Sequence, residues 1–143
     1  MNTFSLQVRD TQSNEIIERV TSFVASDATG SFGIQAGHSR FLTALRFGLA
    51  KFRSSAGHQS DDHIGWRYLA MPGGILYFRD NLLQINTRRY FIGENYDEMT
   101  KILEQTLLVE EQQLTQIKQN LRQLEEGVLK RLWEIQQRRG KLM

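Results

Sequence analysis

Two stretches of the sequence gather side chains that could do chemistry. The first, GSFGIQAGHS over residues 30–39, sets His38 between Gly37 and Ser39. A catalytic serine needs a base beside it and a carboxylate that orients the base. Neighbouring side chains on an extended chain point to opposite sides, so His38 and Ser39 do not make such a pair. We therefore interpret His38 as a turn or interface residue, because the glycines around it suit a tight turn.

The second stretch, GHQSDDHIG, contains His58, Asp61, Asp62 and His63. Imidazoles and carboxylates are ligands that divalent metals accept. The glycines at both ends indicate a hairpin loop, where polar residues gather in any case. A metal-dependent hydrolase built on this loop is therefore the third of our hypotheses, behind two non-catalytic ones. We expect no bound metal and no other cofactor.

Sites for phosphate or nucleic acid receive less support. The glycine-rich run over residues 30–37 lacks the Lys-Ser/Thr pair of a P-loop, and no helical pattern follows it. Arg88 and Arg89 precede two aromatic residues, but one basic pair is too little for a nucleic-acid surface. The chain has 18 basic and 16 acidic residues, a balance that predicts no nucleic-acid partner. No combination of residues supports an enzyme.

The elements that must position these residues change in character near Tyr96. Before it, most of the glycines and the only proline separate short apolar runs that alternate with period two, as in residues 4–9. Asp80 and Asn81 link two such runs and predict a tight hairpin. We expect an antiparallel β-sandwich over residues 1–92.

After Tyr96 the pattern becomes helical. Apolar residues recur with a heptad spacing at Leu107, Leu114, Leu121, Val128 and Ile135. Good helix formers surround them. We expect residues 93–143 to form either a helical hairpin, with its turn near residues 118–123, or one helix about 60 Å long. We favour the hairpin, because a single helix would leave its apolar stripe uncovered.

One motif connects the sequence to a family. The run Gly30-x-Phe32-Gly33-Ile34-x-x-Gly37-His38-x-x-x-Leu42-Thr43 resembles the signature of the epsilon subunit of F-type ATP synthases. YLAMPGGILYF, over residues 68–78, is similar to a second motif of that family. The order of a β-rich half and a helical half is similar as well, so the resemblance covers nearly the whole chain. GSFGI and the C-terminal VLKRLWE most resemble the alternate, N-type branch of these ATPases.

The resemblance implies a rotor subunit of the central stalk that is not itself catalytic. Its sandwich would join the gamma subunit to the ring of membrane c subunits, and so couple the transport of protons or sodium ions to ATP synthesis. His38 and Thr43 would face gamma, whereas Gly30, Ser31 and Phe32 would rest on the c ring. The C-terminal helices of the family can inhibit ATP hydrolysis by extending along gamma toward the alpha and beta subunits.

Three positions depart from the family pattern. Ala36 stands where the family usually has proline, and Ser31 stands where it usually has an acidic residue. Some members bind ATP through a motif at the first helix that ends in Arg-Ala. Thr100 occupies the position of that arginine here, so we expect no ATP sensing.

The resemblance implies a place at the cytoplasmic face of a bacterial inner membrane, where the chain is held through the complex. The N-terminus, MNTFSLQVRD, predicts no signal peptide, because it lacks a basic region followed by an apolar run. No apolar stretch approaches the length that a membrane helix needs. The alternative hypothesis is a free-standing β-sandwich adaptor that dimerises through its C-terminal heptads.

Overall fold

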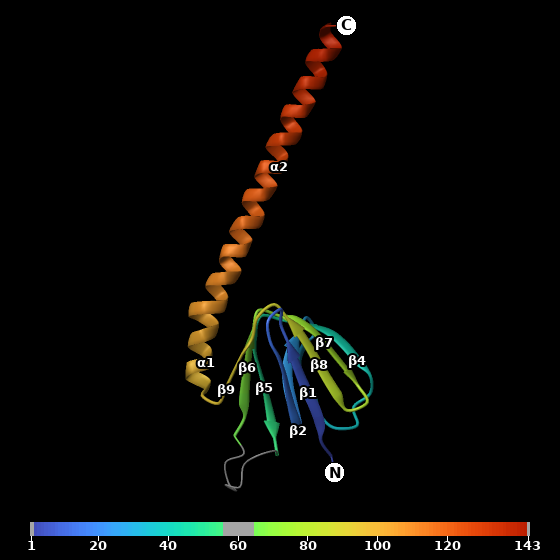
Figure 1. Cartoon of the computed structure of the whole chain (residues 1–143), viewed down its shortest axis with the longest axis vertical. Coiled ribbons are helices and arrows are strands. Elements are labelled where there is room, and N and C mark those ends of the chain that lie inside the picture. Colours follow the sequence, from blue (N-terminus) through green and yellow to red (C-terminus); the bar gives the residue numbers. More distant parts are fainter. Residues whose placement is uncertain (1, 56–64, 143) are drawn as a thin grey trace. The chain divides into compact units, whose positions relative to one another are not determined.

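The computed structural model describes residues 2–55 and 65–142, with side chains through residue 139. The chain divides into two compact units, Met1–Leu108 and Val109–Met143. The strands of the first unit are β1 (Phe4–Arg9), β2 (Asn14–Asp27), β3 (Gly30–Ile34), β4 (Phe41–Leu45), β5 (Gly48–Ser54), β6 (Arg67–Met71), β7 (Gly74–Arg79), β8 (Leu82–Thr87) and β9 (Phe91–Gly93) (Figure 1). The helical elements that follow are α1 (Tyr96–Ile102), a π-helical turn η1 (Leu103–Leu107) and α2 (Leu108–Leu142).

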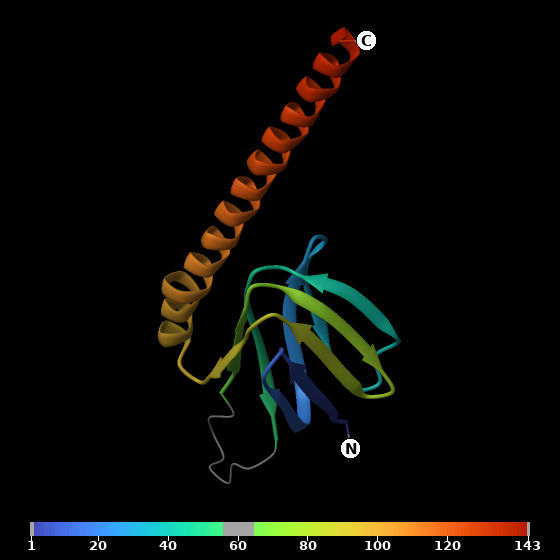
Figure 2. The same ribbon diagram turned by 45° about the horizontal axis from the view of Figure 1, so that its top comes forward.

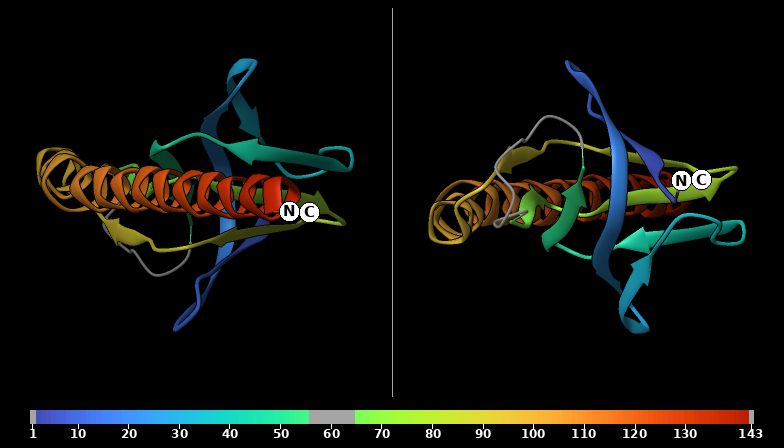
Figure 3. Two further views of the ribbon diagram at one scale, coloured as in Figure 1. Left: turned by 90° about the horizontal axis from the view of Figure 1, so that it is seen from above. Right: turned by 90° about the horizontal axis from the view of Figure 1, so that it is seen from below.

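The strands form the β-sandwich that the sequence predicts. β4, β7, β8 and β1 lie side by side in one layer, and β5, β6 and β9 continue the sheet on the other side of β2 (Figure 2). β2 belongs to both layers, because it pairs with β1 near its start and with β3 and β5 near its end. Figure 3 shows this long strand running between two hairpins that lie at opposite sides of the sandwich.

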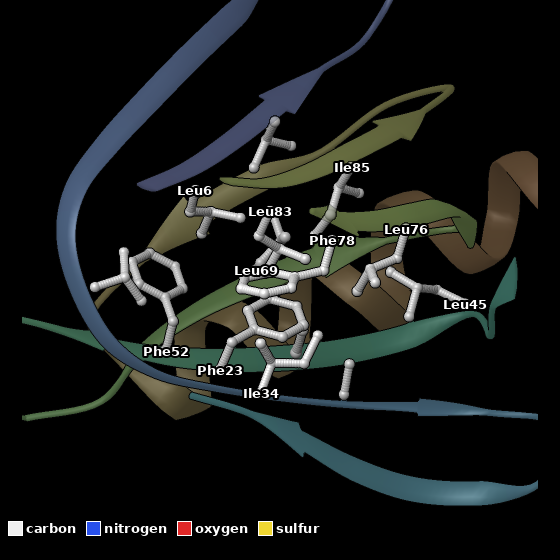
Figure 4. Packing of buried hydrophobic residues seen from close by; sticks show 14 of the residues in the cluster. Leu6, Phe23, Ile34, Leu45, Phe52, Leu69, Leu76, Phe78, Leu83 and Ile85 are labelled. Atoms are coloured by element: carbon white, nitrogen blue, oxygen red, sulfur yellow. The ribbon is translucent and has the colours of Figure 1, made fainter. Parts of the chain in front are cut away.

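Alternation along the strands builds one core between the layers. In β1, Phe4, Leu6 and Val8 are buried, whereas the polar residues between them are more exposed. Phe23 and Phe52 are fully buried members of this cluster, which Figure 4 shows from close by. Each fully buried side chain of this kind contributes roughly 1.5–3 kcal/mol to folding. The sandwich therefore has a substantial core of its own.

The predicted hairpin at Asp80 and Asn81 is confirmed. Both residues have positive φ, 51° and 58°, and they connect β7 to β8 in antiparallel register. Two-residue turns of this kind match the right-handed twist of the strands, and Asn and Asp tolerate the conformation better than most residues.

The first helical turns belong to the sandwich. Asn95 caps α1 by accepting a hydrogen bond from the backbone nitrogen of Glu98 at 3.2 Å. Met99 and Leu107 are buried with Ala70, on the face of β6 opposite the main core. A regular α-helix returns to one face after seven residues. Leu107 comes one residue later than that after Met99, and the π turn accommodates the extra residue, so that both side chains reach the sheet.

The predicted turn near residues 118–123 is wrong. α2 continues through this segment as one helix of 35 residues, which confirms the long-helix alternative. No proline lies in the segment, and Gly127 costs only about 1 kcal/mol relative to alanine in a helix. Because the second unit consists of this helix alone, its apolar stripe has no cover within the unit. No helix of the described residues combines the length and the apolar character that crossing a membrane requires.

The predicted domain boundary between residues 92 and 93 stays a prediction. The first compact unit extends beyond it, because α1 and η1 pack against β6 and β9.

Candidate functional site

The glycine-rich signature occupies both ends of β3. Gly30 begins the strand with φ of 121°, and Gly37 lies in the turn beyond its end with φ of 79°. Glycine adopts these conformations without the steric penalty that a side chain would bring. A five-residue strand spans about 16 Å. The signature therefore forms two separate turns, one on each side of β3.

Asp27 organises the first of these turns. The residue is only 6% exposed, and its carboxylate accepts hydrogen bonds from the backbone nitrogen and the hydroxyl of Thr29, at 2.8 and 2.5 Å. Its second oxygen accepts a hydrogen bond from the hydroxyl of Thr43 at 2.7 Å. The hydroxyls of Thr29 and Thr43 hold the pKa of Asp27 below its ordinary value, because they stabilise the charged form. This network fastens β4 to the β2–β3 hairpin.

The three residues that the resemblance assigns to the c ring lie beside this network. Gly30 and Ser31 are exposed at the start of β3. Phe32 is half-buried instead, and its ring packs edge-on against Phe41 with 5.3 Å between the centroids. The hairpin thus presents two small residues to solvent and uses the third to anchor itself on the core.

His38 lies at the second turn and is exposed. Its Nδ1–H donates to the backbone oxygen of Ser39 at 2.7 Å, which leaves Nε2 as the acceptor of the neutral ring. The ring rests edge-on against Phe41 and Phe78, with centroids 5.7 and 5.8 Å apart. Among the described residues its hydrogen-bond partner is a backbone oxygen, not the carboxylate that orients a catalytic histidine.

A neighbouring hairpin holds this second turn in place. The backbone nitrogen of Gly37 donates to the side-chain oxygen of Asn81 at 2.8 Å. The backbone oxygen of Asn81 in turn accepts from the nitrogen of Ser5 at 3.0 Å. Asn81 therefore links the His38 turn both to the β7–β8 hairpin and to β1.

The two residues that the resemblance assigns to gamma have different hydrogen-bond partners in the described structure. Thr43 is half-buried and bonded to Asp27 at the first turn, whereas His38 belongs to the second. Phe41 connects them, since its ring contacts His38 and it lies two positions before Thr43 on β4.

Sequence reasoning missed both supporting residues, Asp27 and Asn81. Asp27 meets Thr43 across 16 positions of sequence, so no local motif marks the pair. The hairpin turn at Asn81 can be predicted from the adjacent sequence. The hydrogen bond between Asn81 and Gly37 cannot, because it spans 44 positions and depends on the packing of two hairpins.

The possible metal ligands His58, Asp61, Asp62 and His63 lie outside the described residues. Over residues 2–55 and 65–142, no group of three or more histidine, aspartate or glutamate side chains is placed to hold a metal ion.

Comparison with known proteins defines the class of this fold. The family model of the ATP synthase delta/epsilon chain, β-sandwich domain, matches residues 3–92. This span is more than half of the chain, and the chain belongs to that family. The resemblance stated from the glycine signature is therefore confirmed.

Particular relatives agree with this assignment. The ATP synthase epsilon chain 2 of Cereibacter sphaeroides is 36% identical over 59 residues, which are 41% of this chain and 36% of the relative. The match thus spans about a third of that relative's length.

Two solved assemblies contain chains of similar fold. One is the central stalk and c ring of the Tetrahymena thermophila mitochondrial ATP synthase, with a TM-score of 0.50 and 19% identity over 61% of this chain and 64% of that chain. The other is the Euglena gracilis mitochondrial ATP synthase, with a TM-score of 0.53 and 18% identity over 72% of this chain and 62% of that chain.

Proposed function

We propose that this protein is the epsilon-type rotor subunit of a bacterial ATP synthase and that it couples the gamma subunit to the c ring. Membership of the delta/epsilon family supports the proposal. The observation that carries it is the form of the signature: two exposed turns, each braced from within by a buried or shared polar side chain. Such turns suit contacts that must transmit torque, because their braced backbone resists displacement. This role requires no catalytic group.

The contact residues in this proposal are those that the family resemblance implies. His38 and Thr43 contact gamma, and Gly30, Ser31 and Phe32 contact the c ring. The hydroxyl of Thr43 is already bonded to Asp27 on the inner side of β4, so its neighbours on the outer face supply exposed surface. Leu42 and Ile75, on the outer face of β4 and β7, are 66% and 50% exposed. Exposed apolar side chains that gather on one face are typical of protein contacts.

The helical half would act as a brake on ATP hydrolysis. The apolar stripe of α2 has no cover within its unit, and gamma, or the alpha and beta subunits, would provide one. ATP itself would not control the brake. Thr100 cannot replace an arginine as a phosphate ligand, and its hydroxyl is bonded to the backbone oxygen of Tyr96 at 2.9 Å. Isothermal titration with ATP should therefore show no binding in the micromolar range.

The subunit has no catalytic activity of its own in this proposal. It reaches the cytoplasmic face of the inner membrane through the complex. The alternative, an adaptor that dimerises through its C-terminal heptads, also rests on the uncovered stripe of α2. A dimer in solution that binds neither gamma nor the c ring would favour the adaptor.

The test is co-purification with gamma and the c ring of the same organism. His38→Ala should weaken binding to gamma by about 1–2 kcal/mol, as an ordinary interface residue does, and leave the thermal unfolding curve unchanged. Lys101→Ala, an exposed cation on α1, is the matched control and should bind as the original chain does. Failure of the unaltered chain to bind gamma would overturn the proposal.

A further inference from the structure

One face of α2 carries a row of apolar side chains that includes the heptad positions from Leu114 onward. The residues of this apolar row follow each other at intervals of three or four, which keeps them on one side of a helix, and they are Leu114, Ile117, Leu121, Leu124, Val128, Leu132 and Ile135. Leu114 is half-buried, and the other six are at least 50% exposed. The row is about 32 Å long in the single continuous helix that Figure 1 shows.

The spacing of the apolar row is nearly the same in both directions along the helix. Its members mirror each other about a midpoint between residues 124 and 125, and the mirrored pairs are Leu114 with Ile135, Ile117 with Leu132, and Leu121 with Val128. Leu124 lies beside the midpoint itself. When two copies of such a helix pack antiparallel, each residue of the row meets an apolar residue of the other copy. A second copy of the chain therefore fits this face along its whole length.

Charged residues at the two ends of the apolar row decide the orientation of such a pair. Helical spacing puts Glu110 and Arg139 on the same face as the row, one before its start and one after its end, and they mirror each other about the same midpoint. In an antiparallel pair, Glu110 of each copy therefore meets Arg139 of the other. A parallel pair would place glutamate on glutamate and arginine on arginine, and like charges repel.

The charge balance of the helix favours a second copy over other partners. Residues 110–139 hold six basic and five acidic residues. Helices that lie on anionic lipid have a polar face rich in Lys and Arg, and this mixture differs from that pattern. A copy of the same helix has the same mixture, and the antiparallel direction brings opposite charges together at both ends.

We propose that the unassembled chain pairs with a second copy of itself through antiparallel contact of the two α2 helices. The contact extends from Glu110 of one copy to Arg139 of the same copy, and it covers the apolar row of both. The inference goes beyond the proposed function, because it concerns the chain before it meets gamma or the c ring. A row of about three heptads is near the shortest that sustains a coiled coil, so we expect a dissociation constant on the order of 10 µM. Unfolding measured below about 1 µM then reports on the single chain.

Sedimentation equilibrium of the full chain, from about 1 to about 200 µM, measures the pairing. Arg139→Glu should weaken it by about tenfold, because one substitution turns the contacts at both ends into like-charge contacts. Glu110→Lys with Arg139→Glu exchanges the two charges and should restore the pairing to within about threefold. Lys130→Glu, on the side of the helix opposite the apolar row, is the matched control and should change the pairing less than twofold, roughly.

Introduced thiols report the orientation of the pair, because the chain has no cysteine of its own. Leu124→Cys lies next to the midpoint and should form a disulfide between two copies under mild oxidation. Ile135→Cys alone should not, because an antiparallel pair holds its two thiols far apart. A mixture of Leu114→Cys and Ile135→Cys should form a mixed disulfide, since these positions meet in the antiparallel pair. Far-UV circular dichroism shows that each variant keeps its helix.

Three results would overturn the inference. The first is a chain that stays a monomer at about 200 µM. The second is an Ile135→Cys variant that joins to itself as readily as the Leu124→Cys variant does. The third is a monomer that binds vesicles of anionic lipid, which would assign the apolar row to a membrane surface. The proposed function is tested separately by binding to gamma, so it stands or fails independently of these results.

Discussion

The two units of this protein use the same apolar residue types in opposite ways. In the sandwich, Phe23, Phe52 and Phe78 are fully buried by strands that are distant in sequence. In α2, Leu124 and Leu129 are each 64% exposed, since a lone helix has nothing in its own unit to cover them. The sandwich is therefore stable through its own contacts, whereas the apolar stripe of α2 can gain stability only through contacts outside its unit.

This difference explains the division of labour that we propose. A coupling element must keep its shape while it transmits force, and a core of cross-strand contacts provides that rigidity. A brake must have two states, and a helix whose apolar face can be covered by one surface or another provides them. The π turn at Leu103–Leu107 lies at the end of the first compact unit.

The largest expected effect comes from the core. Phe23→Ala should lower the free energy of unfolding by about 3–5 kcal/mol, because it leaves a cavity among residues that cannot collapse freely. Leu124→Ala should change it by less than about 0.5 kcal/mol, because the side chain is exposed and both residues form helices well. Urea unfolding of the full chain compares the two. Similar losses would mean that α2 is covered by the sandwich.

A second, smaller effect should come from the first helical turns. A chain that ends after Gly93 loses Met99 and Leu107 from the second cluster, and should lose about 2–4 kcal/mol of stability while it remains β-rich and unfolds cooperatively. A chain that ends after Glu110 keeps both side chains, and should unfold as the full chain does.

Calorimetry on these two truncated chains locates the edge of the stable unit. Equal stability of both would contradict the role that the structure gives to Met99 and Leu107. Loss of β-structure in the shorter chain would contradict the predicted boundary after residue 92.

The smallest effect concerns Asp27 and pH. Its folded-state pKa is lowered by the hydroxyls of Thr29 and Thr43, so it stabilises the fold above the unfolded value of 3.8, and this contribution is lost as the pH falls through the folded pKa. Asp27→Asn should lower the melting temperature at pH 7, and the difference from the unaltered chain should shrink below pH 3.8. Asp97→Asn, an exposed residue at the start of α1, is the control. A difference in melting temperature that stays constant down to about pH 2 would contradict this role of the Asp27 carboxylate.

Much of the fold was predictable because short-range sequence patterns determine it. The period-two alternation of β1 and the Asp80–Asn81 turn each depend on neighbouring residues alone. The hairpin expected near residues 118–123 was wrong because it was inferred from the need to cover a stripe, although no residue there breaks a helix. Local helix propensity decided the outcome within the unit.

The site was predictable only in part. The glycines of the signature predicted turns, and the structure contains turns at Gly30 and Gly37. The sequence could not show that Asp27 and Thr43 meet, or that Asn81 supports the His38 turn, because tertiary packing creates these pairs. Nor does the seven-residue pattern reveal the π turn, which exists because Leu107 must reach Ala70.

The most direct test of the central claim is the affinity of two chains for the purified gamma subunit. We predict that the chain ending after Glu110 binds gamma within about threefold of the full chain, because the sandwich carries the coupling contacts. In the assembled enzyme the same truncation should leave ATP synthesis in place and raise ATP hydrolysis. Loss of gamma binding on removal of α2, or failure of both chains to bind gamma, would contradict the account.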